Sequence, residues 1–325
     1  MRLAVRRVVR GPPNNAATKV LGVTTTSTAR INTRPDGGRP TRAEIVAVFV
    51  TVTAWASAFV AIRGVKDSFE PGALALGRLF VGSVALGAAV LFRRRWIQPT
   101  RREIGLVGIC GVGWFAVYNV ALNAAEQRVD AGTAAMLINV GPIFIALLAG
   151  LLLGEGFPRW LLIGTGVAFT GAVVIAAATS RTATSDVVGV LLCLLAASTW
   201  AVGVMAQKVA LRRLPALQVT QMACTVGMIA CLPFSSQLVY ALPHATGRAI
   251  AGVVYLGLVP TAVAFGTWAY ALSRTDAGRL AVTTYLVPPL TILLAWPLLG
   301  ETPPVLALLG GAFALTGVWL TRRSR

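Results

Sequence analysis

Ten long apolar blocks constrain the fold of this chain more than any other feature. Each has about 20 residues with almost no charge, enough to cross a bilayer as a helix, and the mean hydropathy of the 325-residue chain is +0.74. Inside a bilayer every main-chain polar group must be satisfied within the segment, which an α-helix achieves. The sequence therefore predicts an all-α membrane protein with ten transmembrane helices. The predicted helices are residues 43–62, 72–92, 103–124, 131–153, 159–179, 187–207, 217–238, 249–272, 277–299 and 304–321.

The chain also contains an internal repeat. Residues 128–171 align with residues 274–317 without a gap, at a constant shift of 146, with 19 identities in 44 positions. Such a repeat indicates two copies of one structural unit, which we place at residues 43–180 and 187–321. Because each copy holds five predicted helices, an odd number, the second copy lies upside down in the membrane relative to the first. Inverted repeats are typical of secondary transporters that open alternately to the two sides.

The basic residues predict the orientation. With a cytoplasmic amino terminus, 23 of the 29 Lys and Arg residues fall inside and five outside, and the ratio is still 14 to 5 without the first 42 residues. The positive-inside rule therefore places both termini in the cytoplasm. The net charge of +18 lies mostly in the amino-terminal tail and in short loops. It does not form the basic face that nucleic-acid binding requires, so we expect a lipid bilayer and no nucleic acid as partner.

The two ends of the chain lie outside the apolar blocks. Residues 1–42 carry nine basic residues and a single acid, Asp36. This composition predicts a disordered basic cytoplasmic tail, with a transit peptide or an over-extended start as alternatives. Residues 322–325 form the cytoplasmic carboxyl-terminal end. Only three of the 29 basic residues are Lys, as in GC-rich bacteria, so we expect a multi-pass protein of the inner (plasma) membrane.

The chain offers little material for a catalytic or metal site. Its four cysteines lie inside apolar blocks without metal-ligand spacing, and His244 is the only histidine. Buried cysteines in such blocks behave as small apolar residues. The sequence therefore predicts no catalytic residue, no metal and no cofactor. The cysteines are Cys110, Cys193, Cys224 and Cys231.

Two related motifs connect the chain to a known family. LLLGE (151–155) and PLLGE (297–301) each end a proline-containing helix and precede a Gly-rich helix, and each half has an early tryptophan, Trp55 and Trp200. Over residues 43–321 this set resembles the EamA-type transporters of the drug/metabolite transporter superfamily. The resemblance implies a secondary active exporter of a small metabolite, amino acid or drug-like solute. It also implies coupling to an ion such as the proton, or to an exchanged substrate.

Proline residues mark the middle of the fourth and ninth predicted helices. A proline removes one helical hydrogen bond and frees the carbonyl four residues earlier, which is tolerated at that depth only where it faces protein, water or ligand. We predict that these prolines line a substrate cavity and act in gating, with a simple packing kink as the alternative. They are Pro142, Pro288 and Pro289.

Polar and aromatic residues near these prolines are the candidate substrate contacts. Asn139 and Tyr285 are equivalent under the shift of 146 and lie one turn before the prolines, with Thr284 beside them. An interhelical hydrogen bond is the alternative role. Four aromatic residues lie away from the helix ends, where an interfacial belt would place them, and bundle packing is their alternative role. They are Trp55, Trp200, Tyr118 and Trp268, with Asn119, Asn123 and Gln207 as weaker candidates.

Arg78 is the one charge well inside an apolar block, and the equivalent position in the second half is Ala223. A charge at that depth needs a reason. We predict a role in binding an anionic substrate, with a partner acid or snorkelling to the interface as alternatives.

Glu155 and Glu301 close the two repeated motifs. We predict that each accepts hydrogen bonds from exposed amides at the start of the next helix, with proton coupling as the alternative. A stripe of small residues at four-residue spacing, in residues 164–172 and 310–318, indicates close helix packing or a homodimer face.

The leading interpretation is a secondary transporter, not an enzyme, that moves a small-molecule substrate by alternating access. The alternatives are a membrane-embedded lipid-modifying enzyme and a scramblase or channel.

Overall fold

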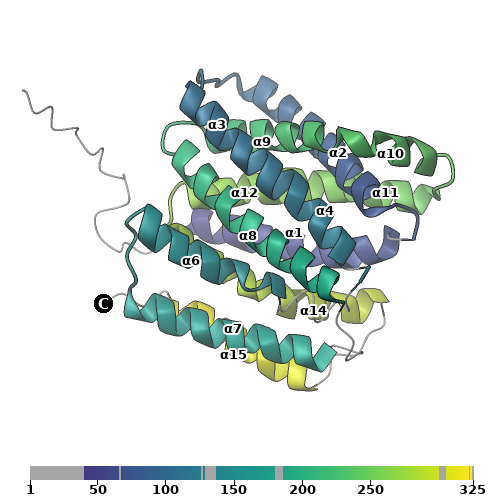
Figure 1. The fold of residues 1–325 in the computed structure, drawn as a ribbon. Helices are drawn as coiled ribbons and strands as arrows, with labels where there is room; N and C mark the ends of the chain where they lie inside the picture. Colours follow the sequence, from purple (N-terminus) through teal and green to yellow (C-terminus); the bar gives the residue numbers. More distant parts are fainter. Residues whose placement is uncertain are drawn as a thin grey trace, which may run out of the picture. The chain divides into compact units, whose positions relative to one another are not determined.

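The structure is a computed structural model that describes residues 40–65, 67–125, 127–128, 137–179, 186–299, 305–321 and 323. All of these belong to one unit, Thr33–Arg325. Throughout the described residues the secondary structure is helical, with no strand (Figure 1). The prediction of an all-α membrane protein is therefore confirmed, whereas residues 1–39 of the predicted tail and Glu301 lie outside the described residues.

The helices of the first half follow the predicted blocks. They are α1 (Arg42–Val65), α2 (Pro71–Arg93), α3 (Arg101–Cys110), the π-helical segment η1 (Gly111–Val117), α4 (Tyr118–Ala125), α6 (Gly141–Leu152) and α7 (Arg159–Thr179).

The second half has corresponding elements. They are α8 (Val187–Ala210), α9 (Ala216–Ala230), the 3-10 turn η2 (Leu232–Phe234), α10 (Ser235–Ala241), α11 (Gly247–Leu256), the π-helical segment η3 (Gly257–Val263), α12 (Ala264–Leu272), α13 (Ala277–Val282), the 3-10 segment η4 (Thr283–Leu286), α14 (Val287–Leu299) and α15 (Val305–Thr321).

Several of these helices are long enough to span a membrane. In the described part of the chain, six helical stretches have the required length and apolar character, and a seventh span results if α9 and the η2–α10 segment are one bent helix. The bend between them is 50° and lies at Cys231. Pro233 follows in η2, and a proline cannot continue the helical hydrogen-bond ladder. Three further apolar helices, α6, α7 and α15, are shorter.

The two π-helical segments occupy equivalent positions, since η1 and η3 are related by the same shift of 146. In η3 the cause is Pro260, which has no N–H for the Leu256 carbonyl. The Thr261 hydroxyl donates to that carbonyl instead, at 2.8 Å. In η1 the Asn119 side chain donates to the Phe115 carbonyl at 2.8 Å. The repeat thus extends well before residue 128, and π-segments of this kind are frequent at functional sites.

The glycines that begin the π-helical segments bring the two halves together. A Cβ atom on Gly111 would lie 2.6 Å from the Ala223 carbonyl oxygen of α9, and one on Gly257 would lie 2.8 Å from the Arg78 carbonyl oxygen of α2. Only glycine permits such an approach of two backbones. Each half therefore packs its π-segment against the second helix of the other half.

Helices α7 and α15 lie side by side (Figure 1) and are joined by the small-residue stripe. A Cβ atom on Gly171 would lie 2.5 Å from the Gly310 carbonyl oxygen, and one on Gly317 would lie 2.6 Å from the Gly164 carbonyl oxygen. These pairs are equivalent under the shift of 146. The prediction of close helix packing is confirmed, and the alternative of a homodimer face is wrong for this stripe because the stripe is buried inside the chain. Its other members are Ala168, Ala172, Ala314 and Val318.

Candidate functional site

Both proline-containing segments are interrupted directly before their prolines. In the first half, Asn139 and Val140 form a turn, and α6 begins at Gly141 with Pro142 in its first turn. In the second half, the 3-10 segment η4 separates α13 from α14, which carries Pro288 and Pro289 in its first turn. The structure therefore has paired helix breaks at positions related by the shift of 146.

The two breaks are in direct contact through Tyr285 and Asn139. Beyond Asn139, the amide of Ile143 donates to the Val140 carbonyl at 3.0 Å. The Asn139 carbonyl instead accepts the hydroxyl of Tyr285 at 2.9 Å. The ring of Tyr285 is 0% exposed. A main-chain acceptor at the break in one half thus bonds a side-chain donor at the break in the other half.

The predicted aromatic residues form one continuous cluster. Trp55 of α1 lies 5.2 Å from Trp268 of α12, and Trp200 of α8 lies 6.3 Å from Tyr118 of α4, measured between ring centroids. Trp114 of η1 joins the two pairs, at 6.2 Å from Trp55 and 6.5 Å from Trp200. Trp114 was not among the predicted residues because its equivalent position holds Pro260, so the repeat gives it no symmetric partner.

Each tryptophan predicted from the repeat lies against the helix break of the other half. A Cβ atom on Gly141 would lie 2.5 Å from the Trp200 ring, and Trp55 packs in one apolar cluster with Val287 at the start of α14. The aromatic cluster and the paired breaks therefore form one central site. It is made by α1, η1, α4, α6, α8, α12 and η4.

Two indole N–H groups of this site are buried without an acceptor among the described residues. They belong to Trp200, which is 6% exposed, and Trp268, which is 1% exposed. Gln207, two turns after Trp200 on α8, is 0% exposed, and neither its amide oxygen nor its amide nitrogen has a partner in that part of the chain. A buried polar group left unpaired costs about 1–3 kcal/mol. A ligand that forms hydrogen bonds with these groups would remove that cost and so gain binding free energy.

The remaining polar candidates donate hydrogen bonds to main-chain carbonyls. The Thr284 hydroxyl donates to the Ala281 carbonyl at 2.7 Å, so only its acceptor side is open to a ligand. The Asn119 side chain donates to the π-segment η1, and the Asn123 side chain donates to the Pro71 carbonyl at 3.0 Å. Both asparagines therefore stabilise the fold in this structure.

Arg78 lies beside the other π-segment. Its Nε donates to the Thr261 hydroxyl oxygen at 3.2 Å, and the residue is only 6% exposed. The side chain does not extend to the surface, so the snorkelling alternative is wrong for this structure. Thr261 lies one turn before Phe265, whose ring is 5.5 Å from Trp55. Arg78 thus bonds a residue that lies one helical turn from the aromatic cluster.

Glu155 bonds a helix of the opposite half. Its Oε1 accepts the amide of Ala277 at 2.8 Å, and its Oε2 accepts the amide of Gly278 at 3.1 Å. The predicted chemistry is therefore present, but the bonded helix is α13 and not the next helix, α7. Sequence order alone could not identify α13. Gly154 and Gly156, both with φ near +70°, form the tight turn that presents Glu155 to α13, a conformation that favours glycine.

Charged groups at the same place act on Glu155. Burial raises the pKa of its carboxyl above the ordinary value, the two amides oppose this, Asp276 raises it further and Lys208 lowers it. Lys208 of α8 donates to the carbonyls of Leu272 and Thr275, at 2.7 and 2.6 Å. The turn between α12 and α13 is therefore held by a cation at its carbonyl side and a carboxylate at its amide side.

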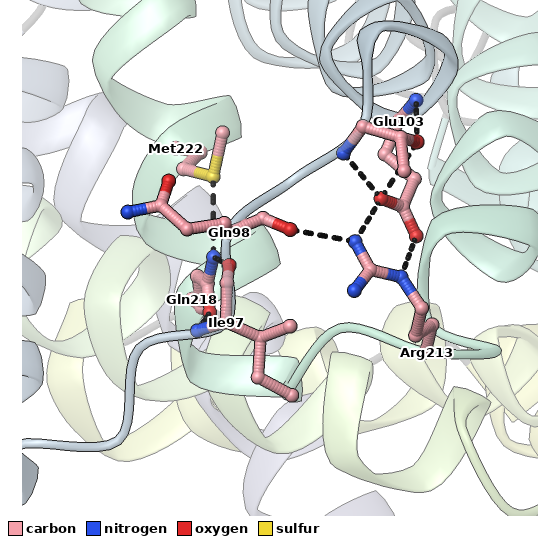
Figure 2. A network of polar contacts seen from close by, with 7 residues as sticks. Ile97, Gln98, Glu103, Arg213, Gln218 and Met222 are labelled. Atoms are coloured by element: carbon pink, nitrogen blue, oxygen red, sulfur yellow. Dashed lines mark hydrogen bonds and ion pairs between the residues drawn. The ribbon is translucent and has the colours of Figure 1, made fainter.

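A second polar network lies just beyond the carboxyl-terminal end of α8, which carries Lys208, and Figure 2 shows it from close by. Arg213 donates through Nε to Glu103 at 2.7 Å, through Nη2 to the other carboxylate oxygen, and to the Gln98 carbonyl at 2.7 Å. Gln218 exchanges two hydrogen bonds with the main chain of Ile97, at 3.0 and 2.6 Å (Figure 2). Since residues 97–103 belong to the first half and Arg213 and Gln218 to the second, the network links the halves. We call the end formed by loops 94–100, 153–158, 211–215 and 273–276 the basic end.

The fold and the site define a class of protein: a helical membrane protein made of two related halves, with broken helices and an aromatic site at their junction. Among the described residues no group of three or more potential metal ligands exists. The sequence profile of the EamA-like transporter family matches residues 42–177 and again residues 187–323. The chain belongs to the EamA-like transporter family.

Relatives and a solved structure agree with this assignment. A probable terminal-alkyne amino-acid exporter of Streptantibioticus cattleyicolor is 39% identical, over 85% of this chain and 92% of that protein. The uncharacterized transporter YdfC of Bacillus subtilis is 34% identical, over 82% and 87%. A probable amino-acid metabolite efflux pump of Salmonella typhimurium is 27% identical, over 83% and 92%. A crystal structure that is 22% identical shares the fold, with a TM-score of 0.73 over 86% of this chain and 96% of that chain.

Proposed function

We propose that this transporter is a secondary active exporter of a small, amphipathic, amino-acid-like metabolite and works by alternating access. In this proposal it crosses the bacterial inner membrane ten times, as two inverted five-helix repeats with both termini in the cytoplasm. The observation that carries the proposal is the bond between Tyr285 and the Asn139 carbonyl. It joins symmetry-related helix breaks, and discontinuous helices at a repeat interface are where secondary transporters place their substrate sites.

The two ends of the bundle support alternating access because they are closed by different chemistry. At the basic end the halves are joined by the Glu103–Arg213 pair and by the Glu155 bonds to α13. At the opposite end an apolar cluster joins them, with Phe69 of the first half and Ala249 and Val253 of the second. The repeat places Ala249 at the position equivalent to Glu103. The repeat therefore does not reproduce the Glu103–Arg213 pair, and the charged contact at the opposite end is instead the exposed pair Arg128–Asp186.

The central site supports the substrate class. Indole N–H groups only donate, so the unpaired groups of Trp200 and Trp268 suit acceptor oxygens such as those of a carboxylate. The ring faces around Trp114 suit an apolar side chain, and Arg78 adds a positive charge nearby. Two relatives are named for an amino acid and an amino-acid metabolite. A zwitterionic substrate with an apolar side chain matches all of these features.

Exchange in proteoliposomes tests the proposal. Proteoliposomes that contain the purified protein are loaded with an unlabelled apolar amino acid, and the uptake of the same amino acid in labelled form is followed. Saturable counterflow is expected of a carrier, whereas flux that grows linearly with concentration would instead indicate a pore.

Two substitutions test the site itself. Trp200→Phe and Trp268→Phe keep an aromatic ring but remove the N–H group. Each is expected to raise KM by at least about tenfold, because hydrogen bonds to charged groups contribute about 1.5–3 kcal/mol. Trp96→Phe is the matched control, since Trp96 is exposed outside the cluster. Unchanged KM in both site variants would refute carboxylate binding by the indoles.

A further inference from the structure

Helices α6 and α7 enclose an apolar groove that the proposed transport cycle does not use. Its volume is about 200 Å³, and its walls come from the two helices and the turn between them. The groove exists because Phe157 folds back onto Gly150, where a Cβ atom would lie 2.4 Å from the ring, and because Gly166 has no side chain to fill it. The residues that matter below are Ile143, Leu147, Phe157, Leu162 and Gly166.

Two arginines lie near the amino-terminal end of α7, where the groove ends. Arg159 begins α7 and shares a helix face with Leu162 and Gly166, three and seven residues later. Its guanidinium lies 5.8 Å from the centroid of the Trp160 ring. The Arg323 guanidinium lies 5.4 Å from the same ring and 4.2 Å from that of Trp319. Arg159 therefore lies on the face of α7 that lines the groove, whereas Arg323 is held between Trp160 and Trp319 of α15.

No acid offsets these charges among the described residues. Neither Arg159 nor Arg323 forms an ion pair there. The neighbouring acid, Glu155, directs its carboxylate to the amides of Ala277 and Gly278. The groove therefore joins an apolar channel to a positively charged, aromatic rim, which is the pattern of a phospholipid with its phosphate at the interface.

We propose that this groove binds an anionic phospholipid, with the phosphate headgroup at Arg159 and Arg323 and one acyl chain between α6 and α7. Guanidinium groups bind phosphate oxygens through paired hydrogen bonds, and Trp160 and Trp319 suit the boundary between headgroup and chain. A zwitterionic lipid has the same chain but no net charge for the rim. This proposal does not depend on the transported substrate.

Native mass spectrometry of the full-length protein tests the proposal, with phosphatidylglycerol and phosphatidylcholine as the two probes. Wild type is expected to retain phosphatidylglycerol in preference to phosphatidylcholine. Arg159→Gln and Arg323→Gln should each weaken phosphatidylglycerol binding about fivefold, from ~1 kcal/mol per basic residue. Gly166→Leu should remove binding by filling the groove, and a Cβ atom at this position meets no atom within 4 Å.

Matched controls separate this site from general effects. Arg248→Gln removes an exposed arginine elsewhere, and Gly105→Leu adds the same side chain at another open helical glycine. Both should bind phosphatidylglycerol as wild type does. Equal retention of the two lipids by wild type would overturn the proposal. Unchanged phosphatidylglycerol binding in the double arginine variant, or in a Gly166→Leu protein that melts as wild type does, would also overturn it.

Discussion

Removing the hydroxyl group of Tyr285 is the sharpest test of the central site. Tyr285→Phe keeps the buried ring and deletes only the donor that bonds the Asn139 carbonyl at 2.9 Å. Interhelical hydrogen bonds in membrane proteins average about 0.6 kcal/mol with a maximum near 1.7, and a buried carbonyl left unpaired costs about 1–3 kcal/mol. We therefore expect a loss of about 1 kcal/mol in the free energy of unfolding.

The same loss changes the balance between transport states. The bond joins the two helix breaks in the conformation described, so its removal favours any conformation in which the breaks separate. About 1 kcal/mol corresponds to a shift of about fivefold in that equilibrium. We expect a lower melting temperature together with a changed exchange rate in proteoliposomes. Tyr285→Ala would be less informative, because deleting a fully buried ring leaves a cavity that costs about 3–5 kcal/mol.

Two variants show whether the reasoning is right. Asn139→Ala keeps the main-chain acceptor that Tyr285 bonds, so a change in transport that Tyr285→Phe does not reproduce would report on the Asn139 side chain. Tyr255→Phe removes an exposed hydroxyl paired with Ser57 at 2.7 Å and should change neither stability nor transport. If Tyr285→Phe melts and exchanges as wild type does, the bond does not couple the halves and the central site is wrongly assigned.

Three further predictions concern the rest of the bundle. A double-mutant cycle on Glu103 and Arg213 should give a coupling energy of at most about 1 kcal/mol, because the arginine side chain is 46% exposed. A larger coupling energy would mean that the pair is shielded from water. Gly317→Ala should lower the free energy of unfolding by more than about 2 kcal/mol, because its Cβ atom would lie 2.3 Å from the Ala168 amide nitrogen. A melting temperature equal to that of wild type would contradict the close packing of α7 and α15. Burial raises the pKa of Glu155 above 4.5, so the free energy of unfolding should fall as pH rises from 4.5 through the higher folded value. Glu155→Gln should remove that slope, and melting curves at several pH values would show it.

The helical class and the positions of the breaks could be predicted from the sequence, because both depend on local properties. Apolar length and missing proline N–H groups act within one segment. The shift of 146 also predicted the pairing of Asn139 with Tyr285 as equivalent positions, and the structure adds that they touch. Here symmetry supplied information about distant parts of the chain that local pattern lacks.

Contacts without a symmetric counterpart could not be predicted. Trp114 is aligned with Pro260 in the repeat, so no second tryptophan marks its position. Lys208 donates to main-chain carbonyls, which every residue has and which side-chain patterns therefore do not reveal. The partner of Glu155 lies 122 residues away. Such contacts depend on which helices pack together, and the sequence of either partner alone does not specify that.

The difference between the two ends of the bundle bears on the direction of transport. Hydrogen bonds broken at the basic end can be replaced by water, so opening there has a small net cost. Opening the opposite end exposes the cluster around Phe69 and Val253, at about 25 cal/mol for each Å² of apolar surface. If the basic end faces the cytoplasm, the end that opens at lower cost is the one through which an exported solute enters. Under the proposed alternating access, substrate binding or a coupled ion would supply the free energy that opens the apolar end.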